Sequence, residues 1–561
     1  MRSAAIRGVD MDVWTLALSD CLDGSQRGDH MRLLESRSRG FSMWLVLAIL
    51  AMALVPYSRA LAQDTPVAGG TYRTAISEEP DQLDPANTNQ LLASSIMNNI
   101  YDALVYIDKD GLPKPWVAES WKISADNLTV TFVIRQGIKF HDGTDLDASA
   151  VKFSFDRILD PAAAAPNKAF LGSLSTVEAP DATTVVFKFK SPYAPFFTNL
   201  LSFGIVSPTA VKASGENFGH DPVGSGPFMF GSWDTGSKIT LKKNPNYVNY
   251  REDDLNKGPA YIDEIVYNVI SEASTQSAAF EAGELDMIGA PREDVARLAA
   301  TDGISIVSLE KSSNINFIEF AANEPYNSEA FRKAVSYAID RQAIADIAYL
   351  GNATPNQCPI PIANAAYDAE LCAKYGYSYD LEKAKKALAD GGFADGDGDG
   401  IVEFKGKNVT VTLWSYAPYP VQSKTIELVQ ADLNKIGLKV EVQTVEFGAM
   451  QPMLESGEIG FDYMRWTYSD QSILSALFKS PGWTGQQKDP ALDKLIEVSD
   501  TTVDPVARIE ASHKVMVYLL QHAVIAPVVS DWVQSAVRDN VHDYHWDALN
   551  TERLIDVWIA K

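Results

Sequence analysis

The stretch AESWKISADNLTVTFVIRQGIKFHDGTDLDASAVKFSFDR, residues 118–157, decides the fold of this chain. Between residues 128 and 134, large apolar side chains alternate with threonine and valine, which indicates a strand with one face on a core. A turn over residues 141–143 follows, and Asp147 then provides an N-cap for a helix that Pro161 ends. The apolar face of this helix carries Val151, Phe155, Ile158 and Leu159.

The same stretch resembles a known protein family. Trp121, a strand that ends in Arg135-x-Gly137, the run Lys-Phe-His-Asp-Gly at 139–143 and the helical Val-x-Phe-Ser at 151–154 occur here in that order. Together they resemble the signature region of the family 5 solute-binding proteins, the peptide-type receptors of ABC importers, and similar landmarks recur along nearly the whole chain. The resemblance implies an α/β, two-lobed periplasmic-binding-protein (Venus-flytrap) fold of the large cluster, with a subdivided first lobe.

Length and charge limit the number of domains and the kinds of partner. The chain has 561 residues, which is too many for one core and favours two or three domains. It carries 73 Asp and Glu against 48 Lys and Arg, a formal net charge of −25. This balance argues against nucleic acid or an anionic membrane as a partner.

The N-terminal part predicts the compartment. Arginines precede an apolar run at residues 41–55, and Ala-Leu-Ala ends at residue 62, which together indicate a secretory signal peptide over residues 31–62 with cleavage after Ala62. We therefore expect a soluble periplasmic protein. Residues 1–30 carry five Asp against three Arg and are interpreted as an upstream extension or a mis-assigned start, because a signal peptide begins with a positive region.

The expected domain boundaries follow from the resemblance. Residues 63–321 are expected to form the first lobe, with an inserted subdomain at about residues 110–230. Residues 322–528 are expected to form the second lobe, and residues 529–561 to rejoin the first.

Strong local signals mark the second lobe. We expect crossovers between the lobes near residues 317–322 and 524–529. Asn327 is expected to cap an amphipathic helix, and Asp380 a further helix that ends at Gly391. Strands alternate with these helices, which predicts an α/β lobe.

Cysteine usage predicts one disulfide. Cys358 and Cys372 are the cysteines that follow the predicted cleavage site, and an even count in an oxidising compartment favours a bond between them. Such a bond closes a loop of about 15 residues and contributes roughly 3 kcal/mol in the chain-entropy model. The alternative is two free thiols.

An acidic turn offers a candidate metal site. Asp395, Asp397 and Asp399 occupy positions 1, 3 and 5 of a run that resembles the first half of an EF-hand loop, and Glu403 falls at position 9. Position 12, where a bidentate glutamate is needed, is Gly406. Two interpretations stay open, a structural calcium site and a solvated acidic turn. We expect no other cofactor.

The segment FDYMRWTYSD, residues 461–470, bears on the ligand. The resemblance implies that this segment faces the cleft in peptide-binding members of the family. In those members, an aspartate three residues after the tryptophan pairs with the α-ammonium of the peptide. Here Ser469 occupies that position after Trp466, and Asp470 follows one residue later. Either a shorter loop moves Asp470 into the role or the ammonium pocket is missing.

Other candidates for the ligand site have alternatives of their own. Arg465 suits bidentate binding of a substrate carboxylate, and its alternative is an internal salt bridge. Aromatic side chains provide apolar contact area in ligand pockets, and their alternative is core packing. The aromatic candidates are Trp414, Tyr416 and Trp466.

The sequence contains no catalytic constellation: neither H-E-x-x-H nor G-x-S-x-G occurs. We therefore expect no enzyme. The resemblance implies a monomeric receptor that captures short peptides or related solutes between two lobes and delivers them to an ABC permease. An opine-like amino-acid conjugate or an oligosaccharide is the alternative ligand. A secreted hydrolase or a chaperone is the alternative class of protein.

Overall fold

The structure is a computed structural model, and it describes residues 65–88, 90–163, 165–417, 420–480, 488–546 and 550–560. The predicted signal peptide and residues 1–30 lie outside the described residues. Residues 66–561 form one compact unit. None of the described helices is both long and apolar enough to cross a membrane.

The deciding stretch forms the expected strand, turn and helix. In β5 (Thr129–Ile134), Val130, Phe132 and Ile134 are at most 1% exposed, as the alternation predicts. Helix α3 (Ala148–Leu159) begins where expected, because the Asp147 carboxylate accepts hydrogen bonds from two backbone amides of its first turn. The four strands of this antiparallel sheet have the order β4 (Ala118–Ile123), β5, β7 (Thr184–Phe189) and β6 (Leu174–Glu178).

A larger mixed sheet of seven strands gathers segments that are far apart in the chain. Its order is β12 (Ile304–Leu309), β21 (Val533–Arg538), β11 (Met287–Gly289), β1 (Thr71–Ile76), β10 (Glu264–Val269), β9 (Lys238–Lys243) and β8 (Phe228–Asp234). Helix α2 (Leu91–Ile100) packs on this sheet through Ile96 and Ile100. On another part of it lie α6 (Ala273–Ala282) and α7 (Val295–Ala299), which share a small core with β11, β12 and β21.

A second sheet of six strands forms the other large core. Its order is β14 (Ala353–Pro355), β20 (Ala526–Asp531), β13 (Asn314–Phe320), β19 (Phe461–Thr467), β17 (Thr410–Ala417) and β18 (Lys439–Glu446). Every residue of β13 is buried, because both faces of the sheet are covered. Ile318 and Phe320 point into one core, and Ile315 and Phe317 point into the other.

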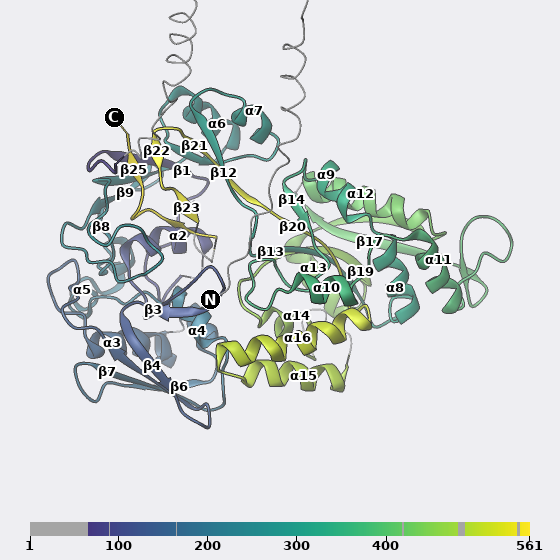
Figure 1. The fold of residues 1–561 in the computed structure, drawn as a ribbon, viewed down its shortest axis with the longest axis horizontal. Helices are drawn as coiled ribbons and strands as arrows, with labels where there is room; N and C mark the ends of the chain where they lie inside the picture. Colours follow the sequence, from purple (N-terminus) through teal and green to yellow (C-terminus); the bar gives the residue numbers. More distant parts are fainter. Residues whose placement is uncertain are drawn as a thin grey trace, which may run out of the picture. The chain divides into compact units, whose positions relative to one another are not determined.

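Helices cover both faces of this second sheet, so the predicted alternation of helices and strands is present (Figure 1). One face carries α8 (Glu329–Ala338), α9 (Arg341–Ile347), α11 (Leu381–Asp390) and α12 (Pro420–Asn434). The other carries α10 (Ala369–Tyr375), α13 (Phe447–Ser456), α14 (Ile473–Phe478), α15 (Pro490–Thr501) and α16 (Pro505–Gln521). Asp380 caps α11 as predicted. The prediction of Asn327 as the cap of α8 is wrong, because the Ser328 hydroxyl accepts the bond from the Phe331 amide.

The chain passes between the two large sheets twice. It leaves β12 and enters β13 through residues 310–313, and it returns from β20 to β21 through Trp532. Strands β13 and β20 are hydrogen-bonded neighbours, and Figure 1 shows β20 running beside β13 towards β21. The segments predicted as crossovers, 317–322 and 524–529, coincide largely with β13 and β20 themselves.

Short elements complete the fold. Four two-stranded ladders pair β2 (Val105–Ile107) with β3 (Pro113–Pro115), β15 (Glu403–Phe404) with β16 (Lys407–Asn408), β22 (Val541–His542) with β25 (Trp558–Ile559), and β23 (His545–Trp546) with β24 (Glu552–Arg553). The C-terminal segment packs on the seven-stranded sheet, since Val541, Leu554 and Val557 belong to its core. Two short helices are α4 (Phe196–Asn199) and α5 (Pro208–Ser214).

Candidate ligand-binding cleft

A cavity of about 320 Å³ lies between elements of the two large sheets. Its lining is dominated by uncharged polar and aromatic side chains. From the side of the seven-stranded sheet and the four-stranded subdomain come, among others, Ser94, Asn98, Tyr101, Trp116, Asn167 and Asn199. From the side of the six-stranded sheet come Ser313, Thr467, Tyr468, Ser469 and Asp470.

Core packing places these side chains. Ile96 and Ile100 hold α2 on the seven-stranded sheet, so that Ser94 and Asn98 of the same helix reach the cavity. At the other wall, β19 is anchored by the buried Tyr463 and its neighbours, and the residues that follow its end line the cavity.

Asp470 is the acidic residue of the cavity wall, and it already has a cationic partner. Its two carboxylate oxygens accept hydrogen bonds from Arg508 of α16, at 2.8 Å from Nη1 and 2.9 Å from Nη2. Both side chains are 3% exposed. The hydroxyl of Thr198 in α4 donates a further bond to Asp470 Oδ2, at 2.8 Å.

This environment holds Asp470 in its charged form. Burial alone would raise the pKa of the carboxyl group, but the Arg508 guanidinium and the hydrogen bonds from Arg508 and Ser472 outweigh burial and lower the pKa. Asp470 is therefore a permanent anion whose charge is balanced inside the protein.

Arg465 also has an internal partner. Its Nε lies 3.3 Å from both carboxylate oxygens of Asp531, and its Nη2 lies 3.2 Å from Oδ2. Asp531 also accepts a bond from Asn316, at 2.8 Å, and lies 3.5 Å from Arg292. Arg465 is not among the residues that line the cavity.

The aromatic candidates lie in the hydrophobic core rather than at the cavity. Tyr416 belongs to the core between the six-stranded sheet and α16, and Trp414 and Trp466 pack against that core. Of the six predicted ligand residues, the structure brings Ser469 and Asp470 to the cavity. Sequence reasoning missed the wall formed by α2 and α4, although the helix of α2 is visible in the sequence pattern from residue 91 onward.

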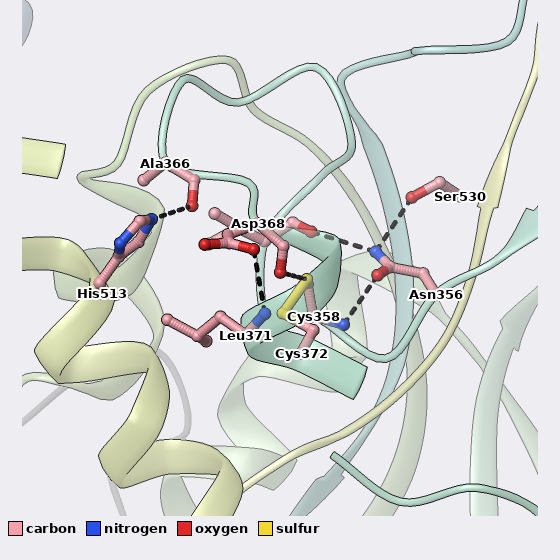
Figure 2. Close-up of a disulfide and its surroundings, with 9 residues drawn as sticks. Asn356, Cys358, Ala366, Asp368, Leu371, Cys372, His513 and Ser530 are labelled. Carbon is pink, nitrogen blue, oxygen red and sulfur yellow. Dashed lines mark hydrogen bonds between the residues drawn. A yellow bond between two sulfur atoms is a disulfide. The ribbon is translucent and has the colours of Figure 1, made fainter. Parts of the chain in front are cut away.

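Cys358 and Cys372 form the predicted disulfide (Figure 2). Neither cysteine lines the cavity. The bond joins the loop after β14 to α10, and both cysteines are buried. The backbone amide of Cys358 donates to Asn356 Oδ1, and the Asn356 amide in turn donates to Ser530 of β20. The disulfide therefore fastens this loop to α10, and Asn356 links the same loop to β20 of the second sheet.

The acidic turn brings the three predicted aspartates together. Oxygens of Asp395, Asp397 and Asp399 lie within 4.8 Å of one another, and all three residues are exposed. Glu403 is not part of this cluster, because its Oε2 accepts a hydrogen bond from the Gly396 amide. No residue of this turn lines the cavity.

Comparisons with known proteins agree with this architecture. The profile of the bacterial extracellular solute-binding proteins, family 5, matches residues 113–485. A glutathione-binding protein, GsiB, of Salmonella paratyphi A is 28% identical over 461 residues, covering 80% of this chain and 84% of its own.

Two solved structures of solute-binding proteins are similar to this chain over most of its length. The oligopeptide-binding protein AppA of Bacillus subtilis, in complex with a nonapeptide, is 25% identical, with a TM-score of 0.66, and the match covers 88% of this chain and all of AppA. The binding protein AgaA of A. tumefacien R10, in complex with agropinic acid, is 26% identical, with a TM-score of 0.64, and the match covers 88% of this chain and 99% of AgaA.

The fold and the cavity between the two sheets define a two-lobed α/β solute-binding protein, and the predicted fold class is confirmed. The chain belongs to family 5 of the bacterial extracellular solute-binding proteins. It is accordingly a non-enzymatic binding component of an ABC transporter, as the sequence predicts.

Proposed function

We propose that this protein is a periplasmic receptor that captures a small solute between its two lobes and delivers it to an ABC permease. Three of the similar proteins are named with glutathione, a nonapeptide and agropinic acid as ligands, which supports a small-solute ligand. The predicted signal peptide over residues 31–62 supports export to the periplasm.

One observation carries this proposal: a single cavity is lined both by α2 and α4 and by the residues at the end of β19. A ligand there contacts elements of both lobes. Such contacts favour the closed arrangement of a two-lobed protein, because a ligand shifts a conformational equilibrium by its differential affinity for the two states. The permease then recognises and binds the closed state of the receptor.

Native mass spectrometry of the protein purified from its host, without refolding, tests the proposal. We expect the wild type to retain a bound mass. Ser202 lines the cavity and is itself exposed, so Ser202→Trp fills the cavity without disturbing the core and abolishes the retained mass.

The matched control is Ser120→Trp, which places the same side chain on the exposed face of β4, and this variant keeps the retained mass. If both variants kept the same bound mass, the cavity would not be the ligand site.

A further inference from the structure

The charges of the cavity wall bear on the chemistry of the ligand. Of the 21 residues that line the cavity in the described part of the chain, one is charged, namely Asp470. Its carboxylate is engaged on both oxygens by Arg508, and the pair is 3% exposed on each side. A ligand ammonium entering the cavity therefore loses its hydration without meeting an unpaired carboxylate, which is costly for a buried charge.

Several hydrogen-bond donors of the wall are committed as well. Thr198 donates to Asp470, Thr467 donates to Asn314, and Ser94 donates to the Gln90 carbonyl. A ligand carboxylate can only accept hydrogen bonds, so it needs free donors or a cation. The hydroxyl hydrogens of these three residues already form hydrogen bonds within the protein.

Two of the three asparagines that line the cavity extend this pattern. Both amide hydrogens of Asn167 are donated to the carbonyls of Pro85 and Thr88, at 2.7 and 2.6 Å. Those of Asn199 are donated to the Phe170 carbonyl and the Tyr193 hydroxyl, at 2.8 and 2.9 Å. The group that each side chain leaves for a ligand is its carbonyl oxygen, which is an acceptor.

We infer that the cleft takes an uncharged, hydroxyl-bearing solute of about the size of a disaccharide, rather than a peptide or glutathione with charged termini. Ligand hydroxyls supply the hydrogens that the acceptors of the wall require, and Trp116, Phe170 and Tyr468 supply apolar ring surface for the ring of the solute. The volume of about 320 Å³ suits a small ligand. This inference rests on the proposed function, since it takes the cavity to be the ligand site.

Isothermal titration calorimetry of the wild-type protein with four kinds of probe tests the inference. The probes are a set of uncharged disaccharides, trialanine with free termini, N-acetyl-trialanine amide, and glutathione. We expect at least one disaccharide to bind at least about 100-fold more tightly than trialanine or glutathione, because an unpaired buried charge costs several kcal/mol. We also expect this binding to change little between about 50 and about 500 mM salt, since no charge pair forms.

A gain-of-function variant provides the second measurement. Ser469→Asp adds an unpaired carboxylate to the wall, and we expect it to bind trialanine about tenfold more tightly than the wild type does. Ser469→Asn has nearly the same shape without the charge, and we expect it to leave trialanine binding unchanged.

The outcomes separate this inference from the proposed function. If the wild type binds trialanine or glutathione more tightly than every uncharged probe, the inference is overturned while the receptor function stands. If N-acetyl-trialanine amide is the tightest probe, the ligand is uncharged but not hydroxyl-bearing, and the inference is overturned in that part. Absence of binding to every probe, together with no retained mass from the host, would overturn both.

Discussion

Two carboxyl groups face each other inside the second sheet. Glu319 of β13 is paired directly with Asp462 of β19, and both are at most 2% exposed. Both carboxyl oxygens of Glu319 and Oδ2 of Asp462 lack a hydrogen-bond partner. Burial raises the pKa of Asp462 to about 7, and burial together with the nearby Asp462 charge raises the pKa of Glu319 well above its ordinary range.

This pair predicts a pH-dependent stability. A carboxyl group whose pKa is raised by folding binds its proton more tightly in the folded state, so its stabilising contribution is present at low pH. That contribution is lost as the pH rises from the ordinary carboxyl range of about 4 to about 7, and the loss is on the order of several kcal/mol. We expect Asp462→Asn to reduce the difference in unfolding free energy between about pH 5 and about pH 8, measured by urea denaturation.

The matched control is Glu382→Gln, because the Glu382 side chain is 87% exposed and its removal changes the net charge by the same amount. We expect this control to follow the wild-type pH profile. Equal profiles for Asp462→Asn and the wild type would show that the buried pair holds no proton.

At the scale of the residue, local chemistry could be predicted and distant partners could not. Asp147 caps α3 as predicted because an N-cap bonds amides two and three residues away. Arg508, which pairs with Asp470, lies 38 residues along the chain, and only the packing of α16 brings it there. The choice between the alternatives for Arg465 and Asp470 therefore depends on tertiary contacts. The spacing of residues along the sequence does not predict such contacts.

At the scale of the element, a structural calcium site and a solvated turn are the two interpretations of the acidic turn, and a response to calcium distinguishes them. The clustered oxygens of Asp395, Asp397 and Asp399 suit the shell of this cation. We expect about 1 mM calcium to raise the unfolding free energy of the wild type by about 1 kcal/mol, as mass action gives for a ligand near ten times its dissociation constant. Thermal melts with and without calcium provide the measurement.

Two variants make this measurement specific. Asp397→Asn removes one ligand charge from the turn and is expected to lose the calcium response. Asp390→Asn changes an exposed carboxylate at the end of α11 and is expected to keep it. A wild-type melting temperature that does not respond to calcium would instead favour the solvated acidic turn.

Elements with strict periodicity were predictable, and elements buried on both faces were less so. The strand β5 and the capped, amphipathic helix α11 can be recognised from the sequence, because one face of each meets the solvent and produces a regular polar and apolar pattern. Strand β13 is buried at every position although Asn314, Asn316 and Glu319 interrupt its apolar residues, so its sequence does not show that both faces are covered. Residues 317–322 are therefore predicted as a strand that crosses between the lobes, whereas the place of this strand inside the six-stranded sheet could not be predicted.

For the whole molecule, export makes a prediction about the N-terminus. Cleavage after Ala62 leaves a mature chain of 561 − 62 = 499 residues that begins at Gln63. We expect the intact mass of the protein from a periplasmic fraction, and its N-terminal peptide, to match this start. Recovery of any peptide from residues 1–30 in the host proteome would contradict the interpretation of that segment as a mis-assigned start.

The order of strands in the seven-stranded sheet has a consequence for biosynthesis. Strand β21 lies between β12 and β11, yet it is made more than 200 residues after either of them. Until it is made, both neighbours present unpaired backbone edges, and β13 and β14 of the other sheet likewise lack β20 until the chain reaches Asp531. A nascent chain that stops before β20 therefore leaves both sheets incomplete, and the last part of the chain closes the two sheets almost together.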